Sequence, residues 1–176
     1  YKKQAGNGSF SVAIDLGTTT IAMALLEHET GTITDTVTLL NPQKVYGTDV
    51  ISRIAAALKQ NAAHEMKQLV TSALENGILK LLRSRDKSNL KGIVIAGNTV
   101  MMHLLLGLDI SGLAAYPFTP SALSFDSVTT DGVPVYFFPC ASPFLGGDVV
   151  AGIYSMKELF ASETVFFLDL GTNGEI

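Results

Sequence analysis

The chain has 176 residues, of which 47% are apolar and 16% are charged, and its formal net charge is −4. This length allows one domain of ordinary size with a substantial buried core, and the acidic balance without a strong cluster of lysine and arginine argues against a nucleic-acid-binding protein. The single cysteine, Cys140, excludes an internal disulfide and cannot bind an iron–sulfur cluster by itself, because such clusters usually need four protein ligands.

The most apolar window does not predict a membrane segment. Residues 93–108 are interrupted by Asn98, Thr99 and His103, and the window is too short and too polar to span a bilayer. The first apolar stretch is interrupted by Asp15 and lacks an alanine-type cleavage site. Together with the lone cysteine, which favours a reducing compartment, these features predict a cytoplasmic protein that does not enter a membrane.

The first part of the chain predicts three strands. Residues 1–9 are polar and contain glycine, and we interpret them as the end of a linker. Strands are expected at residues 10–15, 20–27 and 34–40, where the sequence is apolar or alternates with β-branched residues. The connections are short, and Gly31 permits a tight hairpin turn. Three strands joined in this way form an antiparallel meander.

The period then changes from strand to helix. A first helix is expected after a cap at Thr48 or Asp49. Its apolar positions are Val50, Ile51, Ile54, Ala55 and Leu58. A second helix has an apolar face that runs from Met66 to Leu82. Residues 90–97 predict a short buried strand, and Asn98 is expected to cap a helix that Gly107 ends.

The remaining segments complete an α/β pattern. A long loop is expected at residues 109–132, a strand at 133–138, a helix at 148–160 and a last strand at 164–169. The order predicts a ribonuclease-H-like mixed sheet, a three-strand antiparallel meander plus parallel strands, with helices on both faces. We expect a first lobe at residues 10–162 and the truncated start of a second lobe at 163–176.

Two stretches share Asp-Leu-Gly-Thr after an apolar strand. They are "AIDLGTTTIAM" at residues 13–23 and "FFLDLGTNGEI" at residues 166–176. In the first, Asp15 ends the strand, Gly17 lets a ligand approach the backbone closely, and Thr18 and Thr19 supply hydroxyl groups. The second repeats this design with Asp169, Gly171, Thr172, Asn173 and Gly174.

These residue types suit a metal–polyphosphate. Successive backbone amides in such a turn can bind an anion. A carboxylate repels a phosphate, but it can hold Mg²⁺, usually through water. One copy would most often be an ordinary hairpin turn, whereas two copies predict a pair of turns that hold a phosphate chain from both sides.

The two turns resemble the first and second phosphate motifs of the superfamily of acetate and sugar kinases, heat-shock chaperones and actin, which is built from two ribonuclease-H-like lobes with nucleotide in the cleft. Three further stretches, at residues 41–54, 95–109 and 143–153, resemble the reductive activators of corrinoid proteins. In that family an actin-like ATPase module is joined to an iron–sulfur domain. It uses ATP to drive the electron transfer that returns Co(II) corrinoid to Co(I).

The resemblance implies a set of site residues. Asp15 and Asp169 are expected to hold Mg²⁺ and to act in catalysis. The phosphates of ATP are expected to contact Gly17, Thr18, Thr19, Gly171, Thr172 and Asn173. Asn98 and Asp148 most simply cap helices. Asn98, at a helix N-terminus near the sheet edge, is also expected to face phosphate, and the family-like setting of Asp148 implies a place in the cleft. His103 is expected to be a packed core histidine.

The resemblance also implies partners. A corrinoid protein is expected as the partner, and a homodimer is a further expectation. The iron–sulfur cluster is expected only in a domain outside this chain. Because the adenosine motif is expected in the second lobe, the lobe alone is predicted to hydrolyse ATP weakly or not at all. Two alternatives stay open: a small-molecule kinase of the same superfamily, and an actin-like or chaperone-like nucleotide switch.

Overall fold

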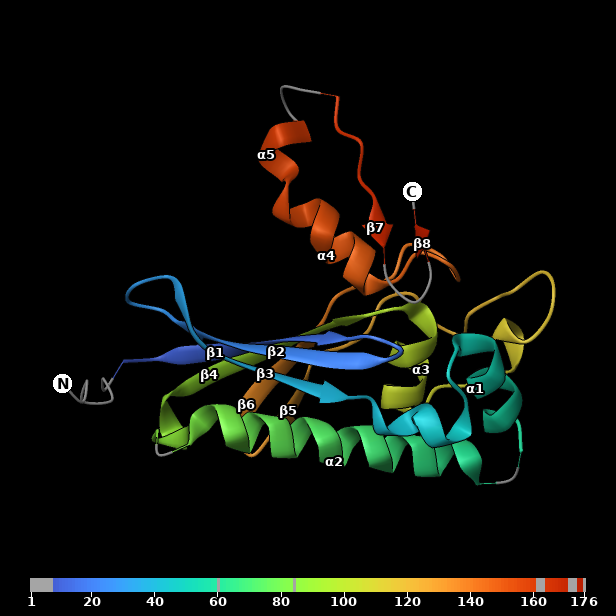
Figure 1. Cartoon of the computed structure of the whole chain (residues 1–176), viewed down its shortest axis with the longest axis horizontal. Helices are drawn as coiled ribbons and strands as arrows, with labels where there is room; N and C mark the ends of the chain where they lie inside the picture. Colours follow the sequence, from blue (N-terminus) through green and yellow to red (C-terminus); the bar gives the residue numbers. More distant parts are fainter. Residues whose placement is uncertain (1–7, 60, 84, 161–163, 171–173, 176) are drawn as a thin grey trace.

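A computed structural model describes residues 8–59, 61–83, 85–160, 164–170 and 174–175 of the chain. Its centre is a six-stranded sheet with the order β3-β2-β1-β4-β6-β5, and β7 and β8 form a separate two-stranded ladder (Figure 1). The strands are β1 (Phe10–Leu16), β2 (Thr20–Glu27), β3 (Thr32–Leu40), β4 (Leu90–Gly97), β5 (Val128–Thr130), β6 (Val133–Phe137), β7 (Asp169–Leu170) and β8 (Gly174–Glu175). The helices are α1 (Val50–Ala57), α2 (Ala62–Leu82), α3 (Thr99–Leu106), α4 (Gly147–Ser155) and α5 (Lys157–Phe160), with 3₁₀ turns at Pro42–Tyr46, Lys87–Asn89 and Ser111–Leu113.

The strand pairing confirms the predicted mixed sheet. β1 pairs antiparallel with β2, and β2 pairs antiparallel with β3, so the first three strands form the expected meander. β4 pairs parallel with β1, and β6 pairs parallel with β4. Parallel neighbours need a crossover connection, and the chain passes through helices α1 and α2 before it enters β4 and through α3 between β4 and β6. The fold is therefore a ribonuclease-H-like lobe of the actin-like type.

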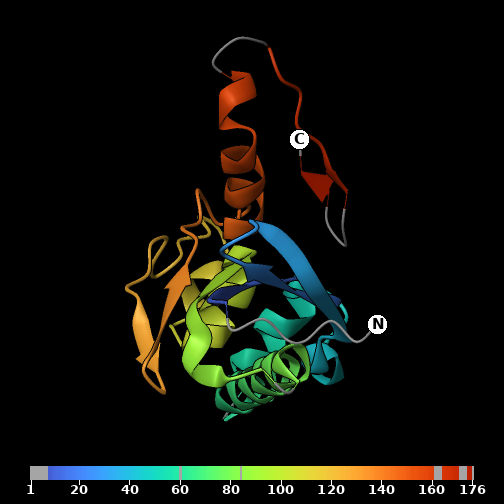
Figure 2. The same cartoon turned by 90° about the vertical axis from the view of Figure 1, so that its left-hand side faces the viewer.

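The hydrophobic core lies between one face of the sheet and helices α1, α2 and α3 (Figures 1 and 2). Strand β1 alternates, so that Val12, Ile14 and Leu16 are buried while Ala13 and Asp15 lie on the other face. Helix α3 is buried almost all round, and its His103 is fully buried as predicted. Within the described residues, no helix has the length and apolar character that crossing a bilayer requires.

The opposite face of the sheet carries small side chains. A groove of about 500 Å³ runs over it. Residues that line this groove include Ala13, Asp15, Ala22, Ala24, Thr36, Thr38, Val94, Ala96, Phe138 and Ala151. Helix α4 begins beside this face and rises away from the sheet (Figures 1 and 2). Asp15 thus faces α4 and not the core.

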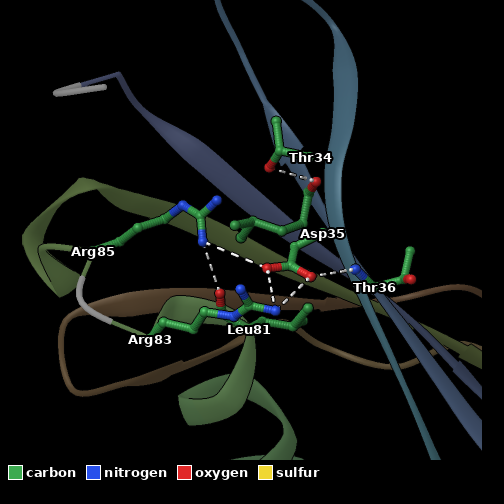
Figure 3. A network of polar contacts seen from close by, with 7 residues as sticks. Thr34, Asp35, Thr36, Leu81, Arg83 and Arg85 are labelled. Carbon is green, nitrogen blue, oxygen red and sulfur yellow. Dashed lines mark hydrogen bonds and ion pairs between the residues drawn. The ribbon is translucent and has the colours of Figure 1, made fainter. Parts of the chain in front are cut away.

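A polar network ties the end of α2 to the sheet (Figure 3). Asp35 of β3 forms ion pairs of 3.3 Å with Arg83 and 3.8 Å with Arg85, which follow α2. Arg85 also donates a hydrogen bond of 3.0 Å to the carbonyl oxygen of Leu81. Because the end of α2 and Asp35 meet far from the first Asp-Leu-Gly-Thr turn, we assign the network a structural role.

Four predicted elements differ from the structure. The buried face of α1 contains Arg53, Ile54 and Ala57, whereas Ile51 is 75% exposed, so the predicted apolar face was wrong in phase. The expected loop at residues 109–132 contains a 3₁₀ turn and strand β5, which pairs antiparallel with β6. The helix expected at 148–160 is two helices, α4 and α5. Of the expected strand at 164–169, only Asp169 has strand pairing among the described residues, as the first residue of β7.

Candidate functional site

The candidate site lies where two parallel strands end side by side. β1 ends at Leu16, which pairs with Gly97 at the end of β4. The first Asp-Leu-Gly-Thr turn follows β1, and Asn98 follows β4. Because the carboxyl ends of parallel strands meet at one edge of a sheet, the turn and Asn98 are brought together although they are far apart in the sequence.

Asn98 has two structural roles at this edge. Its side-chain oxygen accepts a hydrogen bond of 2.9 Å from the backbone amide of Met101, which makes it the N-cap of α3, as predicted. Its side-chain amide donates a hydrogen bond of 2.9 Å to the hydroxyl oxygen of Thr18. One residue therefore fixes the start of α3 and the first turn relative to each other.

The N-terminus of α4 lies against the N-terminus of α3. Gly146 is the N-cap of α4, and a Cβ atom placed on it would be 2.3 Å from Cα of Asn98 and 2.8 Å from the carbonyl oxygen of Gly97. The hydroxyl group of Thr99 also donates a hydrogen bond of 2.7 Å to the carbonyl oxygen of Ser142, in the loop before α4. Two positive helix ends therefore converge beside the first turn, an arrangement that favours an anion.

Three carboxyl groups at this edge lie near enough to one another to interact electrostatically. Partial burial raises the pKa of the Asp15 carboxyl group, and the charges of Asp148 and Asp169 raise it further. Asp15 is nevertheless an exposed residue that lines the groove over the sheet. Burial also raises the pKa of Asp148, hydrogen bonds from backbone amides, first that of Val149, lower it by less, and the charge of Asp169 adds a smaller rise. Mutual repulsion of this kind is relieved by a cation.

The donor set fits Mg²⁺ bound together with phosphate. Among the described residues, no cluster of three or more His, Cys, Asp or Glu side chains is close enough to enclose a metal ion. Mg²⁺ keeps several of its waters and typically binds through one or two carboxylates plus substrate phosphates. Carboxylates that influence one another from a distance, beside two helix N-termini, match that mode of binding.

The predicted site residues divide into three groups. Asp15, Thr18, Asn98, Asp148 and Asp169 lie at this edge of the sheet. Thr19 is exposed, in the same turn, and Gly17 is required there because a Cβ atom would lie 2.6 Å from the carbonyl oxygen of Thr20. Gly171, Thr172 and Asn173 lie outside the described residues, so of the second turn the structure describes Asp169, Leu170 and Gly174, the last two paired across β7 and β8.

The predicted capping role of Asp148 was wrong. Gly146 is the N-cap of α4, and α4 begins at Gly147, so Asp148 is the second residue of the helix. Its carboxylate accepts a hydrogen bond of 2.9 Å from the amide of the adjacent Val149. Gly146 and Gly147 pack closely against neighbouring backbone, and the helix starts two residues earlier than a cap at Asp148 would place it. The charge of Asp148 contributes to the raised pKa of Asp15.

Two residues that the sequence analysis missed hold the first turn from the interior. The side-chain amide of the buried Asn41 donates a hydrogen bond of 2.9 Å to the carbonyl oxygen of Gly17. Its backbone amide donates a hydrogen bond of 2.8 Å to the carbonyl oxygen of Thr19. The buried Arg53 donates to the carbonyl oxygen of Thr18 at 2.6 Å. Spacing could have identified Arg53, because it lies three residues after Val50 and four before Ala57, on the buried face of α1.

Comparisons with known proteins identify the family of the chain. A family model described as "RACo middle region" matches residues 10–159. The chain is 30% identical, over 179 aligned positions, to the corrinoid activation enzyme RamQ of Eubacterium limosum, in an alignment that covers 95% of this chain and 30% of RamQ. A solved structure, a reductive activator for a corrinoid, iron–sulfur protein, superposes with a TM-score of 0.88 at 31% identity and covers 97% of this chain and 29% of that one.

The fold and its strand-end site define a ribonuclease-H-like lobe of the actin-like class. The chain belongs to the RACo middle region family, because the family model matches most of its length. It spans less than a third of the length of the two relatives named above.

Proposed function

We propose that the chain is the first nucleotide-binding lobe of an ATP-dependent reductive activator of a corrinoid protein. The observation that carries the proposal is the convergence of the first turn, the two helix N-termini and three carboxyl groups at one edge of the sheet. An anion alone would be repelled by the carboxylates, and a metal ion alone would be repelled by the helix ends. A magnesium–polyphosphate offers a cation to the carboxylates and an anion to the helix N-termini. The two relatives named above are activators of corrinoid proteins by name.

Different residues of the site would contact the phosphates and the Mg²⁺ ion of the ligand. The backbone around Gly17, Thr18 and Thr19 would contact the phosphates, together with Asn98 at the N-terminus of α3. Asp15 and Asp169 would hold Mg²⁺ through water, with Asp148 beside them. When bound, Mg²⁺ supplies positive charge that offsets the negative charge on the phosphate oxygens. We propose that Gly171, Thr172 and Asn173 contact the same phosphates from the second lobe.

The role of this lobe in turnover would be positioning. In phosphoryl transfer the protein contributes orientation and electrostatic stabilisation, and little covalent chemistry. Here the first turn is held by hydrogen bonds on both sides, from Asn98 and from Asn41. ATP binding between two lobes would change their relative orientation. That motion would permit an iron–sulfur domain outside this chain to pass an electron to Co(II) corrinoid and form Co(I).

Calorimetric titration tests the proposed ligand. The chain is titrated with a non-hydrolysable ATP analogue, with and without Mg²⁺, and we expect binding that requires Mg²⁺. Asp15→Asn should weaken this binding about tenfold or more, because a carboxylate that holds the metal is lost. Asp126→Asn makes the same change of charge at an exposed residue of another loop and should leave the affinity within about twofold. Binding that is absent, or that both variants weaken equally, contradicts the proposal.

Visible spectroscopy tests the proposed partner. The full-length parent protein is mixed with a purified Co(II) corrinoid protein, an electron donor and MgATP, and formation of Co(I) is followed by its absorbance. We expect Co(I) to form with the wild-type parent and to be lost with Asp15→Asn. Formation of Co(I) at an unchanged rate without ATP would show that this site does not drive the reduction.

A further inference from the structure

We propose that Arg53 is a positioning residue of the nucleotide site, which orients the first turn from behind and places a positive charge under the bound phosphates. This inference rests on the proposed function, because it assigns a residue to the same site. Arg53 lies in the first turn of α1 and is fully buried. It is 35 positions from Thr18 in the sequence, so the contact depends on the tertiary fold.

The guanidinium group joins three segments of chain. One terminal nitrogen, Nη2, donates a hydrogen bond of 2.6 Å to the carbonyl oxygen of Thr18. Nε donates at 3.0 Å to the carbonyl oxygen of Gly47, and Nη1 lies 3.4 Å from the side-chain oxygen of Gln43. Gln43 is itself buried and donates a hydrogen bond of 3.1 Å to the carbonyl oxygen of Met66 in α2. The first turn is thereby connected to α1 and α2 through one planar side chain.

The direction of these contacts determines where the amides of the turn point. The carbonyl oxygens of Gly17, Thr18 and Thr19 are all bonded to the interior, by Asn41 and Arg53. In a trans peptide the N–H bond points opposite to the C=O bond of the same unit. The peptide units of the turn therefore direct their amides away from Arg53, toward the edge where Asn98 and Asp15 lie. Arg53 and Asn41 together orient the anion-binding face.

The charge of Arg53 is not balanced by an ion pair within the described residues. Its partners there are two carbonyl oxygens, one amide oxygen and the sulfur of Met101 at 3.1 Å. Asp49 acts on Arg53 electrostatically, but its carboxylate is occupied as the cap of α1 through Ser52. Burial lowers the pKa of Arg53, and an arginine side chain nevertheless stays protonated in proteins. A buried charge with neutral partners is unfavourable, and a phosphate chain on the other side of the turn would compensate it.

Two substitutions separate orientation from charge. Arg53→Met removes both the fork of donors and the charge, while it keeps a long side chain. Arg53→Lys keeps the charge but cannot bind the carbonyl oxygens of Thr18 and Gly47 in the same planar geometry. The matched control is Ile54→Ala, which removes the next buried side chain of α1 and destabilises the core without touching the turn.

The test is calorimetric titration with Mg²⁺ and the non-hydrolysable ATP analogue, at a temperature where circular dichroism shows each variant folded. We expect Arg53→Met to raise Kd about tenfold to a hundredfold, Arg53→Lys to raise it by a smaller factor, and Ile54→Ala to leave it within about twofold. If Arg53→Met does not fold, the comparison of Arg53→Lys with Ile54→Ala decides.

The outcomes separate this inference from the proposed function. If the wild type binds and the folded Arg53 variants bind equally well, the role of Arg53 is overturned and the proposed function stands. The same conclusion follows if Ile54→Ala weakens binding as much as the Arg53 variants do. Absence of binding by the wild-type chain overturns the proposed function and this inference with it.

Discussion

The side-chain amide of Asn98 donates a hydrogen bond of 2.9 Å to the hydroxyl oxygen of Thr18, although the two residues are 80 positions apart in the sequence. Asn98 also caps α3 through Met101. The same side chain therefore contributes to helix stability and to the geometry of the first turn, and the two contributions can be measured separately.

Asn98→Ala should lower both stability and nucleotide affinity. Loss of an N-cap asparagine typically lowers the free energy of unfolding by about 1 kcal/mol, and loss of the bond to Thr18 leaves the turn less well held. Thr18→Val removes the same bond and spares the cap. We expect both variants to weaken binding of the Mg²⁺–ATP analogue, and only Asn98→Ala to lower the urea midpoint by the full amount of a lost cap. Asp86→Ala, which removes the cap of a remote 3₁₀ turn, should leave affinity unchanged.

Gly146→Ala should be strongly destabilising. Its Cβ atom would lie 2.3 Å from Cα of Asn98 and 2.8 Å from the carbonyl oxygen of Gly97, so backbone atoms would have to move. Overpacking of this kind costs about 1–3 kcal/mol, sometimes more. Gly92→Ala is the control, because its Cβ atom would meet neighbours only at 3.7 Å and beyond. Equal free energies of unfolding for the two variants would show that α3 and α4 do not meet as closely as described.

Asp148→Asn should stabilise the ligand-free chain at neutral pH. The pKa of Asp148 is raised in the folded state, mainly by burial. For a carboxyl group with a raised pKa, stability is highest below the unfolded value of 3.8 and is lost as pH rises through the folded value. Asparagine avoids this loss, by up to about 1 kcal/mol at pH 7. Urea unfolding at pH 7 and near pH 3.5 should show a gain at the higher pH and little at the lower.

His103 should make the chain less stable in mild acid. Its Nδ1 lies 2.7 Å from the carbonyl oxygen of Thr99, whereas Nε2 is buried with no hydrogen-bond partner in the part of the chain that the structure describes. Burial lowers the pKa of His103, and the hydrogen bond with Thr99 and the charge of Asp109 oppose this only in part. For a histidine with a lowered pKa, stability is present above the unfolded value of 6.5 and is lost as pH falls through the folded value.

His103→Leu isolates this effect. The wild type should lose up to about 1.4 kcal/mol per pH unit relative to the variant as pH falls from the unfolded value of 6.5 toward the lower folded pKa of His103, and no more below that pKa. The check is the difference between the two unfolding free energies from pH 7.5 to pH 5. A difference that does not change with pH would show that His103 titrates alike in the folded and unfolded chain.

Local signals predicted much of the fold. Asn98 and Gly107 mark the two ends of α3 as expected, because a side-chain cap and a left-handed glycine act on the nearest backbone groups. The apolar stretches at residues 10–15 and 20–27 likewise predicted β1 and β2. Strand β5 was missed because Val128, Thr129 and Thr130 are exposed and the strand has three residues, so it carries no periodic signal.

The rest depends on tertiary contacts. The interior support of the first turn was missed because the predicted face of α1 contained apolar residues only, whereas Arg53 lies on its buried face. The strand expected at residues 164–169 also depended on tertiary contacts, because an apolar run forms a strand only where another strand pairs with it. In the structure a Cβ atom on Gly152 of α4 would lie 2.8 Å from the ring of Phe167, so this segment packs along the helix and not in a ladder.

The most direct test of the central claim is an NMR titration of the ¹⁵N-labelled chain with Mg²⁺ and the non-hydrolysable ATP analogue. We expect the largest changes in amide chemical shift at Gly17, Thr18 and Thr19, at Asn98, and at the start of α4. These changes should require both Mg²⁺ and nucleotide. Changes confined to other surfaces, or none at saturating ligand, would contradict the central claim.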